Sequence, residues 1–146
     1  SIFRSRSGWP WRMKAICTAT AYAAQMDKKE ADRAAWNNIM LVDPPDSDDL
    51  YLRFTKRVFS DVWSRPGLAR RERRLVTLTA IAATGNGPIL PHHLKPALES
   101  GDLTTNELAE WVVHLAHYAG WPASAQAYTA LRMAAAELGI EFEDDD

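Results

Sequence analysis

Apolar residues recur along this chain at the spacing of a helix. In the clearest stretch, Leu50, Phe54, Val58 and Val62 follow one another every four residues, which keeps them on one side of a helix. No stretch shows the two-residue alternation of a half-buried strand, and no internal repeat is found. The pattern therefore predicts an all-α fold.

Glycine, proline and capping residues set the ends of the expected helices. Gly85 and Gly87 follow a central helix that is apolar over most of its girth and is therefore expected to be buried. Thr104 stands three residues before Glu107, which is the spacing of a capping box at a helix start. Pro122 begins another helix after a glycine break. The expected helices cover residues 27–40, 47–62, 69–84, 91–101, 104–119 and 122–137.

The predicted organisation is a single helical domain with an extension at each end. A chain of 146 residues has the usual size of one domain. Residues 1–25 mix basic, aromatic and small residues and are expected to lie outside the core, either frayed or against another subunit. Residues 26–140 are the expected domain. Residues 141–146 form an acidic tail, which is expected to fray because negative charge opposes the dipole at a helix C-terminus.

Composition argues against several classes of function. The formal net charge of −2 argues against a nucleic-acid binder, which usually carries a basic excess. No apolar run approaches the roughly 20 residues that a membrane span requires, so no membrane partner is expected. The single cysteine, Cys17, excludes an intrachain disulfide and dithiol redox chemistry within one chain. It suits a reducing compartment and predicts a cytoplasmic protein, although a secreted protein without disulfides would share this pattern.

Four arginines crowd the first turns of the central helix: Arg70, Arg71, Arg73 and Arg74. Positive charge at a helix N-terminus is unfavourable by roughly 0.3–1 kcal/mol per exposed residue. The commoner explanation is a solvated basic face. The alternative is that a guanidinium grips a carboxylate of a substrate or a partner subunit through its bidentate fork. For Arg73, near the buried stripe, both interpretations stay open.

Histidines and aromatic residues mark two further candidate sites. His92 and His93 are adjacent and point about 100° apart on a helix, so at most one of them faces a given pocket. On the next helix a polar and aromatic stripe recurs at helical spacing, formed by Glu110, His114, His117, Tyr118 and Trp121. Such residues suit a pocket wall or an interface, while a solvated outer face is the simpler interpretation. A metal site of Glu110, His114 and His117 is not expected, because no second carboxylate motif of the di-iron type accompanies it.

Several of these pieces together resemble the carboxymuconolactone decarboxylase family. The similarity covers roughly residues 58–138. Its most specific parts are the run Trp63-Ser64-Arg65-Pro66-Gly67-Leu68, Arg73 before Leu75-Val76, His93 before Ala97-Leu98, and His114 with Tyr118-Ala119-Gly120-Trp121-Pro122. The resemblance implies an alkyl hydroperoxidase D-like helical bundle that assembles as a homotrimer or homohexamer, with sites near subunit boundaries.

The same resemblance implies roles for the candidate residues. His93 is expected to donate a proton or to stabilise an oxyanion, and a histidine with a pKa near neutrality suits proton delivery. Arg73 is expected to neutralise a substrate carboxylate or to order the site. The expected substrate-binding residues are Trp63, Arg65, His114, His117, Tyr118 and Trp121.

The implied activity is a decarboxylation in aromatic catabolism that needs no cofactor. A carboxylated unsaturated lactone, or a similar small cyclic acid, loses carbon dioxide. The electrons left behind spread into the lactone carbonyl, so the substrate is its own electron sink. The alternatives are a non-catalytic helical oligomer or small-ligand binder, and a related lyase or hydrolase that acts on a different lactone.

The thiol peroxidase activity of the wider alkyl hydroperoxidase D superfamily is not expected. Members of that superfamily carry a Cys-x-x-Cys pair, a following histidine and a glutamate proton relay. In this chain the histidine position matches His93, but the cysteine positions match Asn86 and Ile89, and the glutamate position matches Arg74. The thiolate nucleophile is therefore missing.

Overall fold

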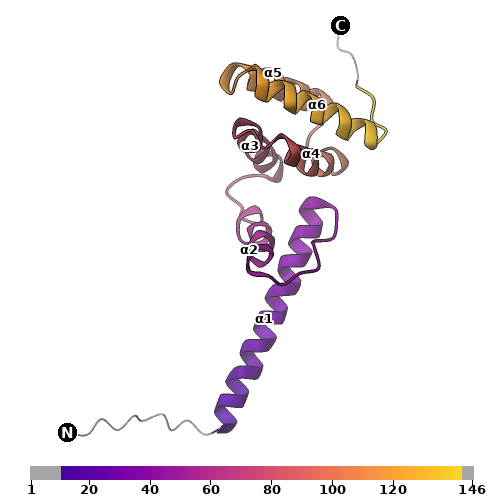
Figure 1. Cartoon of the computed structure of the whole chain (residues 1–146). Coiled ribbons are helices and arrows are strands. Elements are labelled where there is room, and N and C mark those ends of the chain that lie inside the picture. The colour runs from indigo at the N-terminus through magenta and orange to yellow at the C-terminus, as the bar shows by residue number, and fades with distance from the viewer. Residues whose placement is uncertain (1–10, 143–146) are drawn as a thin grey trace, which may run out of the picture.

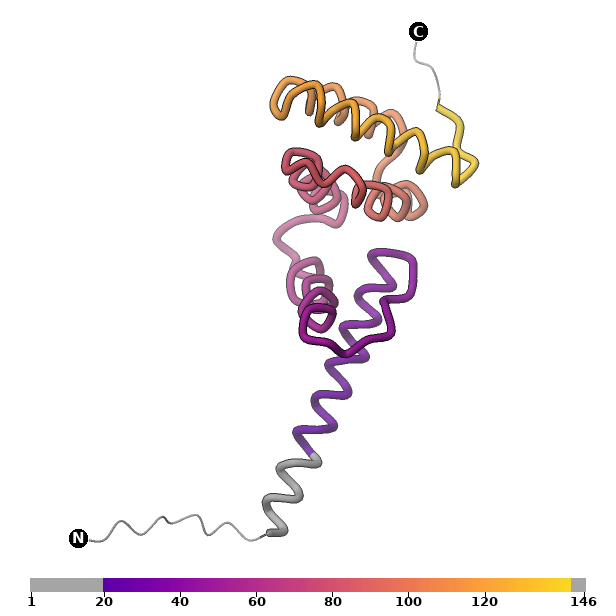
Figure 2. Tube along the Cα trace, in the orientation of Figure 1, coloured from indigo at the N-terminus to yellow at the C-terminus, as the bar shows by residue number. Residues whose placement is uncertain are grey.

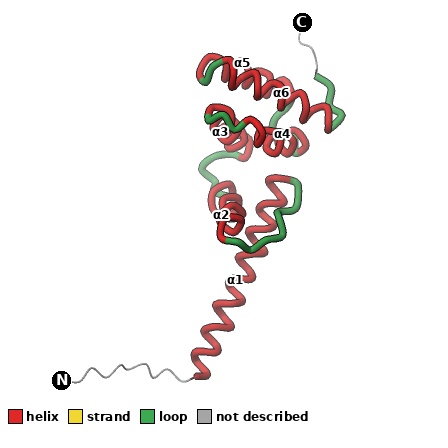
Figure 3. Tube along the Cα trace, viewed as in Figure 1, coloured by secondary structure: helices red, strands yellow, loops and turns green. Residues whose placement is uncertain are grey.

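The computed structural model describes residues 11–142, with side chains from residue 20 onward. The long helix α1 (Trp11–Met40) is followed by α2 (Leu50–Val58), which runs directly into a π-helical turn, η1 (Phe59–Trp63). The remaining elements are α3 (Arg70–Ala83), the 3-10 turn η2 (Gly87–Ile89), α4 (Leu90–Glu99), α5 (Thr105–Tyr118) and α6 (Trp121–Glu137). No strand occurs among the described residues, which confirms the all-α prediction (Figure 3).

The helices stack in layers along the molecule. α5 and α6 lie across α3 and α4, and α1 and α2 lie on the far side of α3 and α4, with the first half of α1 projecting away (Figure 1). The chain returns from α1 to α2 through the loop 41–49 (Figure 2). The main core lies between α3, α4, α5 and α6 and contains Leu78, Ala82, Leu90, Leu94, Ala97, Leu98, Leu103, Leu108, Trp111, Val112, Leu115, Ala127, Ala130, Leu131, Ala134 and Ala135.

A smaller core joins α1 to η1. Ile39 and Met40 at the end of α1 pack with Phe59, and two tryptophans, Trp36 and Trp63, pack against them. The rings of Trp36 and Phe59 meet edge to face, with their centroids 5.0 Å apart, which is a favoured aromatic geometry. This second core packs the π-helical turn η1 against the end of α1.

The central helix α3 is buried on one side only, which corrects the expectation of a largely buried helix. Leu78 and Ala82 are buried, and Leu75 and Ile81 pack against the core at its edges. Val76, in contrast, is 61% exposed. A helix at the edge of a layer needs only one apolar face, so the additional apolar residues of α3 remain on the surface of the single chain.

Helix α1 is longer than the expected helix 27–40. It begins at Trp11 and runs without interruption through residue 25, so the predicted boundary between extension and domain falls inside a helix. Tyr22 and Met26 on this segment are 68% and 46% exposed. The expectations for residues 1–10 and 143–146 lie outside the described residues. No helix among the described residues combines the length and the hydropathy needed to cross a bilayer.

The ends of α2 differ from the sequence expectation. Asp49 is the N-cap, and its carboxylate accepts a hydrogen bond from the Leu52 amide at 2.9 Å, so the helix begins at Leu50 rather than at residue 47. The expected helix 47–62 ends at Val58 as an α-helix and continues as the π-helical turn. Such turns are rare and occur frequently at functional sites.

The capping box at the start of α5 is confirmed. The Glu107 amide donates to the Thr104 hydroxyl at 3.2 Å, and the Thr104 amide donates to the Glu107 carboxylate at 2.9 Å. Thr104→Ala should lower the free energy of unfolding by about 1 kcal/mol, because the Glu107 amide loses its acceptor. Urea unfolding measures the effect. Thr105→Ala is the matched control and should change stability by less than half as much, and equal losses would contradict the role of the cap.

Candidate active site

Arg74 is the buried centre of the site. Its side chain is fully buried, and its Nε lies 3.3 Å from the carboxylate of Asp102. One guanidinium nitrogen, Nη2, donates to the carbonyl oxygen of Ile39. The guanidinium carbon also lies 5.2 Å from the ring centroid of Trp63, within the range of a cation–π interaction. Arg74 therefore joins α3 to the end of α1, to η1 and to the loop that follows α4.

Asp102 supplies the counter-charge. Its carboxylate also pairs with Arg70, whose Nε lies 2.7 Å from Oδ2. Burial acts to raise the pKa of Asp102, but the hydrogen bonds from Arg70, Ser100 and Arg74 and the charge of Arg70 outweigh it and hold the pKa below its ordinary value. The carboxylate is therefore charged at neutral pH, and it compensates part of the cost of burying Arg74.

His93, which belongs to α4, lies beside the guanidinium of Arg74. Its side chain is half-buried, and its Nδ1 is buried without a hydrogen-bond partner. Burial, together with the charges of Arg74 and His92, lowers the pKa of His93 from 6.5 to about 4. The imidazole is therefore neutral at pH 7. A neutral imidazole keeps one N–H as a hydrogen-bond donor and one nitrogen as an acceptor.

The local backbone around His93 is irregular. Pro91 stands in the first turn of α4, and Pro96 lies inside the same helix. Because proline has no amide hydrogen, the carbonyl of His92 lacks the helix bond that residue 96 would otherwise donate. The helix continues through Pro96, and Leu94 and Ala97 on either side of it are fully buried. Core packing thus holds His93 on a helix that its own sequence weakens.

Two nitrogens at this centre lack a hydrogen-bond partner. Arg74 Nη1 and His93 Nδ1 are both buried, and neither has a partner within the described chain. A buried polar atom without a partner costs roughly 1–3 kcal/mol, so such atoms need an explanation. A carboxylate or an enolate oxygen accepts hydrogen bonds and would satisfy a donor on each side chain.

Arg73 lies one residue before this centre and has a different contact. Its Nη2 donates to the carbonyl oxygen of Arg65 at 2.9 Å, and its Nε is buried without a partner. Arg65 itself is exposed. Trp63 is half-buried between Arg74 and Phe59, whose ring centroid is 5.7 Å away. Of the predicted residues, the structure thus brings Trp63 and His93 to the fully buried guanidinium, which belongs to Arg74.

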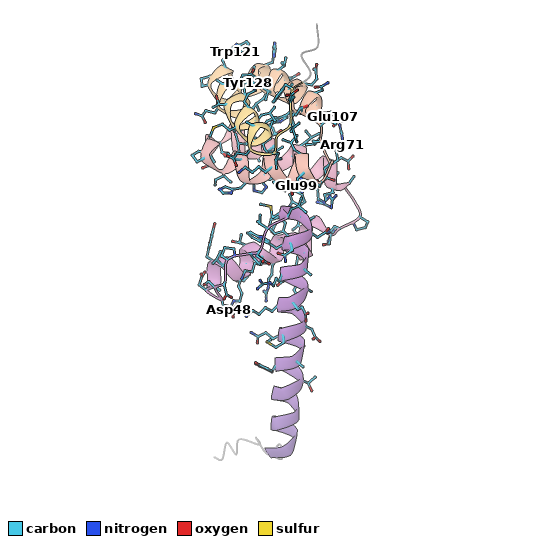
Figure 4. The ribbon with its side chains drawn as sticks, turned by 90° about the vertical axis from the view of Figure 1, so that its right-hand side faces the viewer. Asp48, Arg71, Glu99, Glu107, Trp121 and Tyr128 are labelled. Atoms are coloured by element: carbon cyan, nitrogen blue, oxygen red, sulfur yellow. The ribbon has the colours of Figure 1, made fainter. Side chains whose placement is uncertain are left out.

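The predicted residues of α5 line a separate, open groove. It has a volume of about 850 Å³ and includes His114, His117 and Tyr118. The rings of His114 and Tyr118 are stacked with centroids 4.6 Å apart, and His117 Nδ1 lies 3.0 Å from the Val113 carbonyl oxygen. Arg71 and Glu107 also line the groove and form an ion pair of 2.6 Å, and Figure 4 shows the two residues close together. His93 does not line this groove.

Three residues named in the sequence analysis, Trp121, Asn86 and Ile89, lie at exposed positions. Trp121 is 73% exposed and lies outside the groove on α5. Asn86 and Ile89, at the positions of the superfamily cysteines, are both exposed beside η2. Among the described residues, no group of three histidine, cysteine or acidic residues is arranged to hold a metal ion.

Sequence reasoning did not assign Arg74 and Asp102 to the site. A signal for Arg74 was present, because residues 74, 78 and 82 repeat every four residues and share one face of α3. Leu78 and Ala82 on that face are core residues. For Asp102 there was no comparable signal, since it lies in a loop whose position depends on how α3 and α4 pack.

The lowered pKa of His93 predicts a pH dependence of stability. Between about pH 6.5 and pH 4, the unfolded chain binds a proton that the native state excludes, so the native state loses stability as pH falls. His93 should lower the free energy of unfolding by about 2 kcal/mol over this pH range, after allowance for its partial exposure. Urea unfolding of the wild type and of His93→Leu at pH 7.5 and pH 4.5 measures it. His117→Gln is the control and should keep the wild-type dependence, whereas an unchanged dependence in His93→Leu would contradict the burial of a neutral imidazole.

Comparison with known proteins agrees with the fold. The sequence model described as the carboxymuconolactone decarboxylase family matches residues 48–133. A 4-carboxymuconolactone decarboxylase of Acinetobacter baylyi is 40% identical over 85 residues, which are 58% of this chain and 63% of that protein. Nitrosuccinic acid decarboxylase npaB of Metarhizium robertsii is 37% identical over 73 residues, which are 50% of each chain. This chain thus spans 63% and 50% of the lengths of these two curated relatives. No solved structure gives a significant match.

The matched region contains the whole candidate site except the end of α1. It begins two residues before α2 and ends within α6, so it includes Trp63, Arg74, His93 and Asp102. Both curated relatives are named decarboxylases. With an all-α, alkyl hydroperoxidase D-like fold and a family match over more than half of its length, this chain belongs to the carboxymuconolactone decarboxylase family.

Proposed function

We propose that this chain is a decarboxylase that needs no cofactor and acts on a carboxylated unsaturated lactone or a similar small cyclic acid. The observation that carries the proposal is the pair of buried, unpartnered nitrogens on Arg74 and His93. Family membership and the names of the two relatives support the reaction type. The proposed setting is the breakdown of aromatic compounds in the cytoplasm, which agrees with the single cysteine of the chain.

The chemistry requires the site to hold negative charge in two places. The bond between the ring carbon and the carboxylate breaks, and carbon dioxide leaves without the bonding electrons. These electrons move through the ring double bond to the lactone carbonyl, which becomes an enolate oxygen. A proton is then added to carbon, which completes the product. Fixed donors aimed at the enolate oxygen lower the barrier by several kcal/mol when water is excluded.

We assign the substrate carboxylate to Arg74 and the enolate oxygen to His93. Arg74 Nη1 binds the substrate carboxylate before it leaves, since a guanidinium donates strong charge-assisted hydrogen bonds. The neutral imidazole of His93 donates to the enolate oxygen. Its pKa of about 4 favours this role over proton delivery by an imidazolium, which would be scarce at pH 7. Arg73 orders the loop at Arg65 and thereby positions Trp63, which shields the site from water.

We also propose that copies of the chain assemble as a trimer or hexamer. The face of α2 and η1 exposes apolar side chains, among them Leu50 at 64%, Phe54 at 59% and Val62 at 44%. Tyr118 and Trp121 are exposed at 81% and 73%. Exposed apolar surface on this scale is typical of an interface. In such an assembly the groove on α5 would contribute to a site only across a subunit boundary.

Light scattering of the purified protein tests the assembly. We expect a mass three or six times that of one chain, and Phe54→Asp should lower it by placing a charge in an apolar contact. Thr55→Asp is the matched control on the same helix turn, because Thr55 is only partly exposed and bonds to the Tyr51 carbonyl. A wild-type mass equal to one chain would contradict the proposed assembly.

A substrate screen tests the reaction. The panel contains unsaturated lactone acids and also nitrosuccinic acid, because one relative is named for that substrate. Carbon dioxide release is the readout, and His93→Ala is the control. Release by the wild type alone supports the proposal, and release from nitrosuccinic acid alone would shift the substrate class to open-chain acids. If wild type and variant release carbon dioxide equally, or neither does, the chain is not a decarboxylase that uses His93.

A further inference from the structure

A second cavity lies between α1 and α2, and neither Arg74 nor His93 lines it. Its volume of about 360 Å³ is in the range of small-molecule sites. Asp48 stands at its edge, and Figure 4 places Asp48 well away from Arg71 and Glu107 at the groove on α5. The cavity is therefore separate from both sites described above.

Positive charge is concentrated in this cavity. Five lining residues are cationic, namely Lys28, Lys29, Arg53, Lys56 and Arg57, and two are acidic, Asp32 and Asp48. The lining therefore has an excess of three positive charges, whereas the whole chain has a formal net charge of −2. A concave surface of one sign concentrates the field and attracts ions of the opposite sign.

The cations on α1 are already neutralised. Lys28 lies 2.8 Å from Asp32 and 2.6 Å from Asp61, and Lys29 lies 2.6 Å from Asp48. Both acidic residues of the lining therefore have partners on α1. The counter-charge on the opposite wall, which belongs to α2, is partial, since Asp32 also lies 3.7 Å from Arg57.

The cations on α2 lack full counter-charges. The side chain of Arg53 has no hydrogen bond or ion pair within the described residues. Lys56 is buried, and its ammonium donates only to the Ser47 carbonyl oxygen at 2.9 Å. Arg57 Nε is buried without a hydrogen bond, although the side chain is 41% exposed and forms a long ion pair with Asp32 at 3.7 Å. Of the three, Lys56 is the buried cation, and burying it without a carboxylate partner is costly; a bound anion would reduce that cost.

The pKa of Asp48 is lowered by neighbouring cations of the cavity. The hydrogen bond from Lys29 is the main cause that lowers it, and the charges of Lys56 and Arg53 act in the same direction. On the wall that belongs to α1, Tyr22 and Met26 add an aromatic and an apolar surface. The cavity therefore combines three incompletely paired cations with a wall that suits a carbon skeleton.

We propose that the cavity between α1 and α2 binds a small multivalent organic anion, either a di- or tricarboxylate or a phosphate ester. Arg53 and Arg57 would hold its anionic groups through their planar forks, because a guanidinium matches both carboxylate and phosphate geometry. Lys56 would act as a buried point charge between them. A monocarboxylate has one charge for three cations and binds more weakly.

Isothermal titration calorimetry of the full chain tests this site with citrate, glycerol 3-phosphate and acetate. We expect both multivalent anions to bind and acetate to bind more weakly, with affinities that fall as sodium chloride is raised. Arg53→Gln should weaken citrate binding about tenfold, the usual effect of losing one charged hydrogen bond. Because the side chain of Arg53 has no partner within the described residues, the variant should fold normally, and circular dichroism checks this.

Arg33→Gln is the matched control. Arg33 is also an exposed arginine of the α1–α2 region, but it pairs with Asp43 and does not line the cavity. It should leave citrate affinity unchanged. Binding of citrate without glycerol 3-phosphate identifies the ligand as a carboxylate, and the reverse identifies a phosphate ester. Equal citrate affinity in Arg53→Gln and the wild type, or no binding of either multivalent anion at millimolar concentration, would overturn the proposal. None of these readouts depends on decarboxylation.

Discussion

Replacing His93 with alanine should reduce the rate of carbon dioxide release by at least about 100-fold, because the enolate oxygen loses a fixed donor. The loss should appear in kcat more than in KM, since that oxygen carries negative charge only after the carboxylate bond begins to break. The fold should survive, because the His93 side chain makes no hydrogen bond through its buried Nδ1. Single-turnover measurements with the best substrate of the screen check the rate.

His92→Ala is the matched control for this experiment. His92 is the exposed neighbour of His93 on the same helix, so the substitution keeps the backbone and changes only the adjacent imidazole. It should alter the rate by less than threefold. His93→Gln should recover part of the lost rate, because its amide N–H can donate from a similar position. A His93→Ala enzyme that keeps the wild-type kcat would exclude His93 from the chemical step.

Replacing Arg74 with methionine should lower the free energy of unfolding by about 3 kcal/mol, as expected when one partner of a buried ionic contact is removed. The Ile39 carbonyl would lose its donor and Trp63 would lose the guanidinium that stacks on it. Asp102 would keep Arg70, which limits the loss. Urea unfolding with tryptophan fluorescence measures the effect, and carbon dioxide release should also disappear because no donor remains for the substrate carboxylate.

Arg71→Met separates this effect from a general effect of removing an arginine from α3. Arg71 is exposed and has a single ion pair with Glu107, and such surface pairs contribute roughly 0–1 kcal/mol. Arg74→Lys tests the geometry, since it keeps the charge but cannot reach Ile39 and Asp102 with one planar fork. If Arg74→Met and Arg71→Met lose equal stability, Arg74 does not join α1 to the bundle as the structure indicates.

Local sequence signals determined the helices and most of their ends. The four-residue repeats of apolar side chains predicted all-α structure, and Thr104 with Glu107 predicted the capping box at the start of α5. These signals work because a helix period and a cap depend only on residues within one or two turns. The motifs at Trp63 and His93 were also sufficient to suggest the family that the wider comparison confirms.

Contacts between distant segments decided which of the candidate side chains meet in the site. Arg73 and Arg74 are adjacent and chemically identical, but only Arg74 lies on the face that packs against Ile39 and Asp102. The pKa of His93 likewise depends on burial and on the charge of Arg74, which no motif records. The groove on α5 and His93 fall on different surfaces of one chain. Sequence alone determined the elements and the candidate side chains, whereas tertiary packing decided which charges meet and which are removed from water, because those energies depend on distances between segments far apart in the chain.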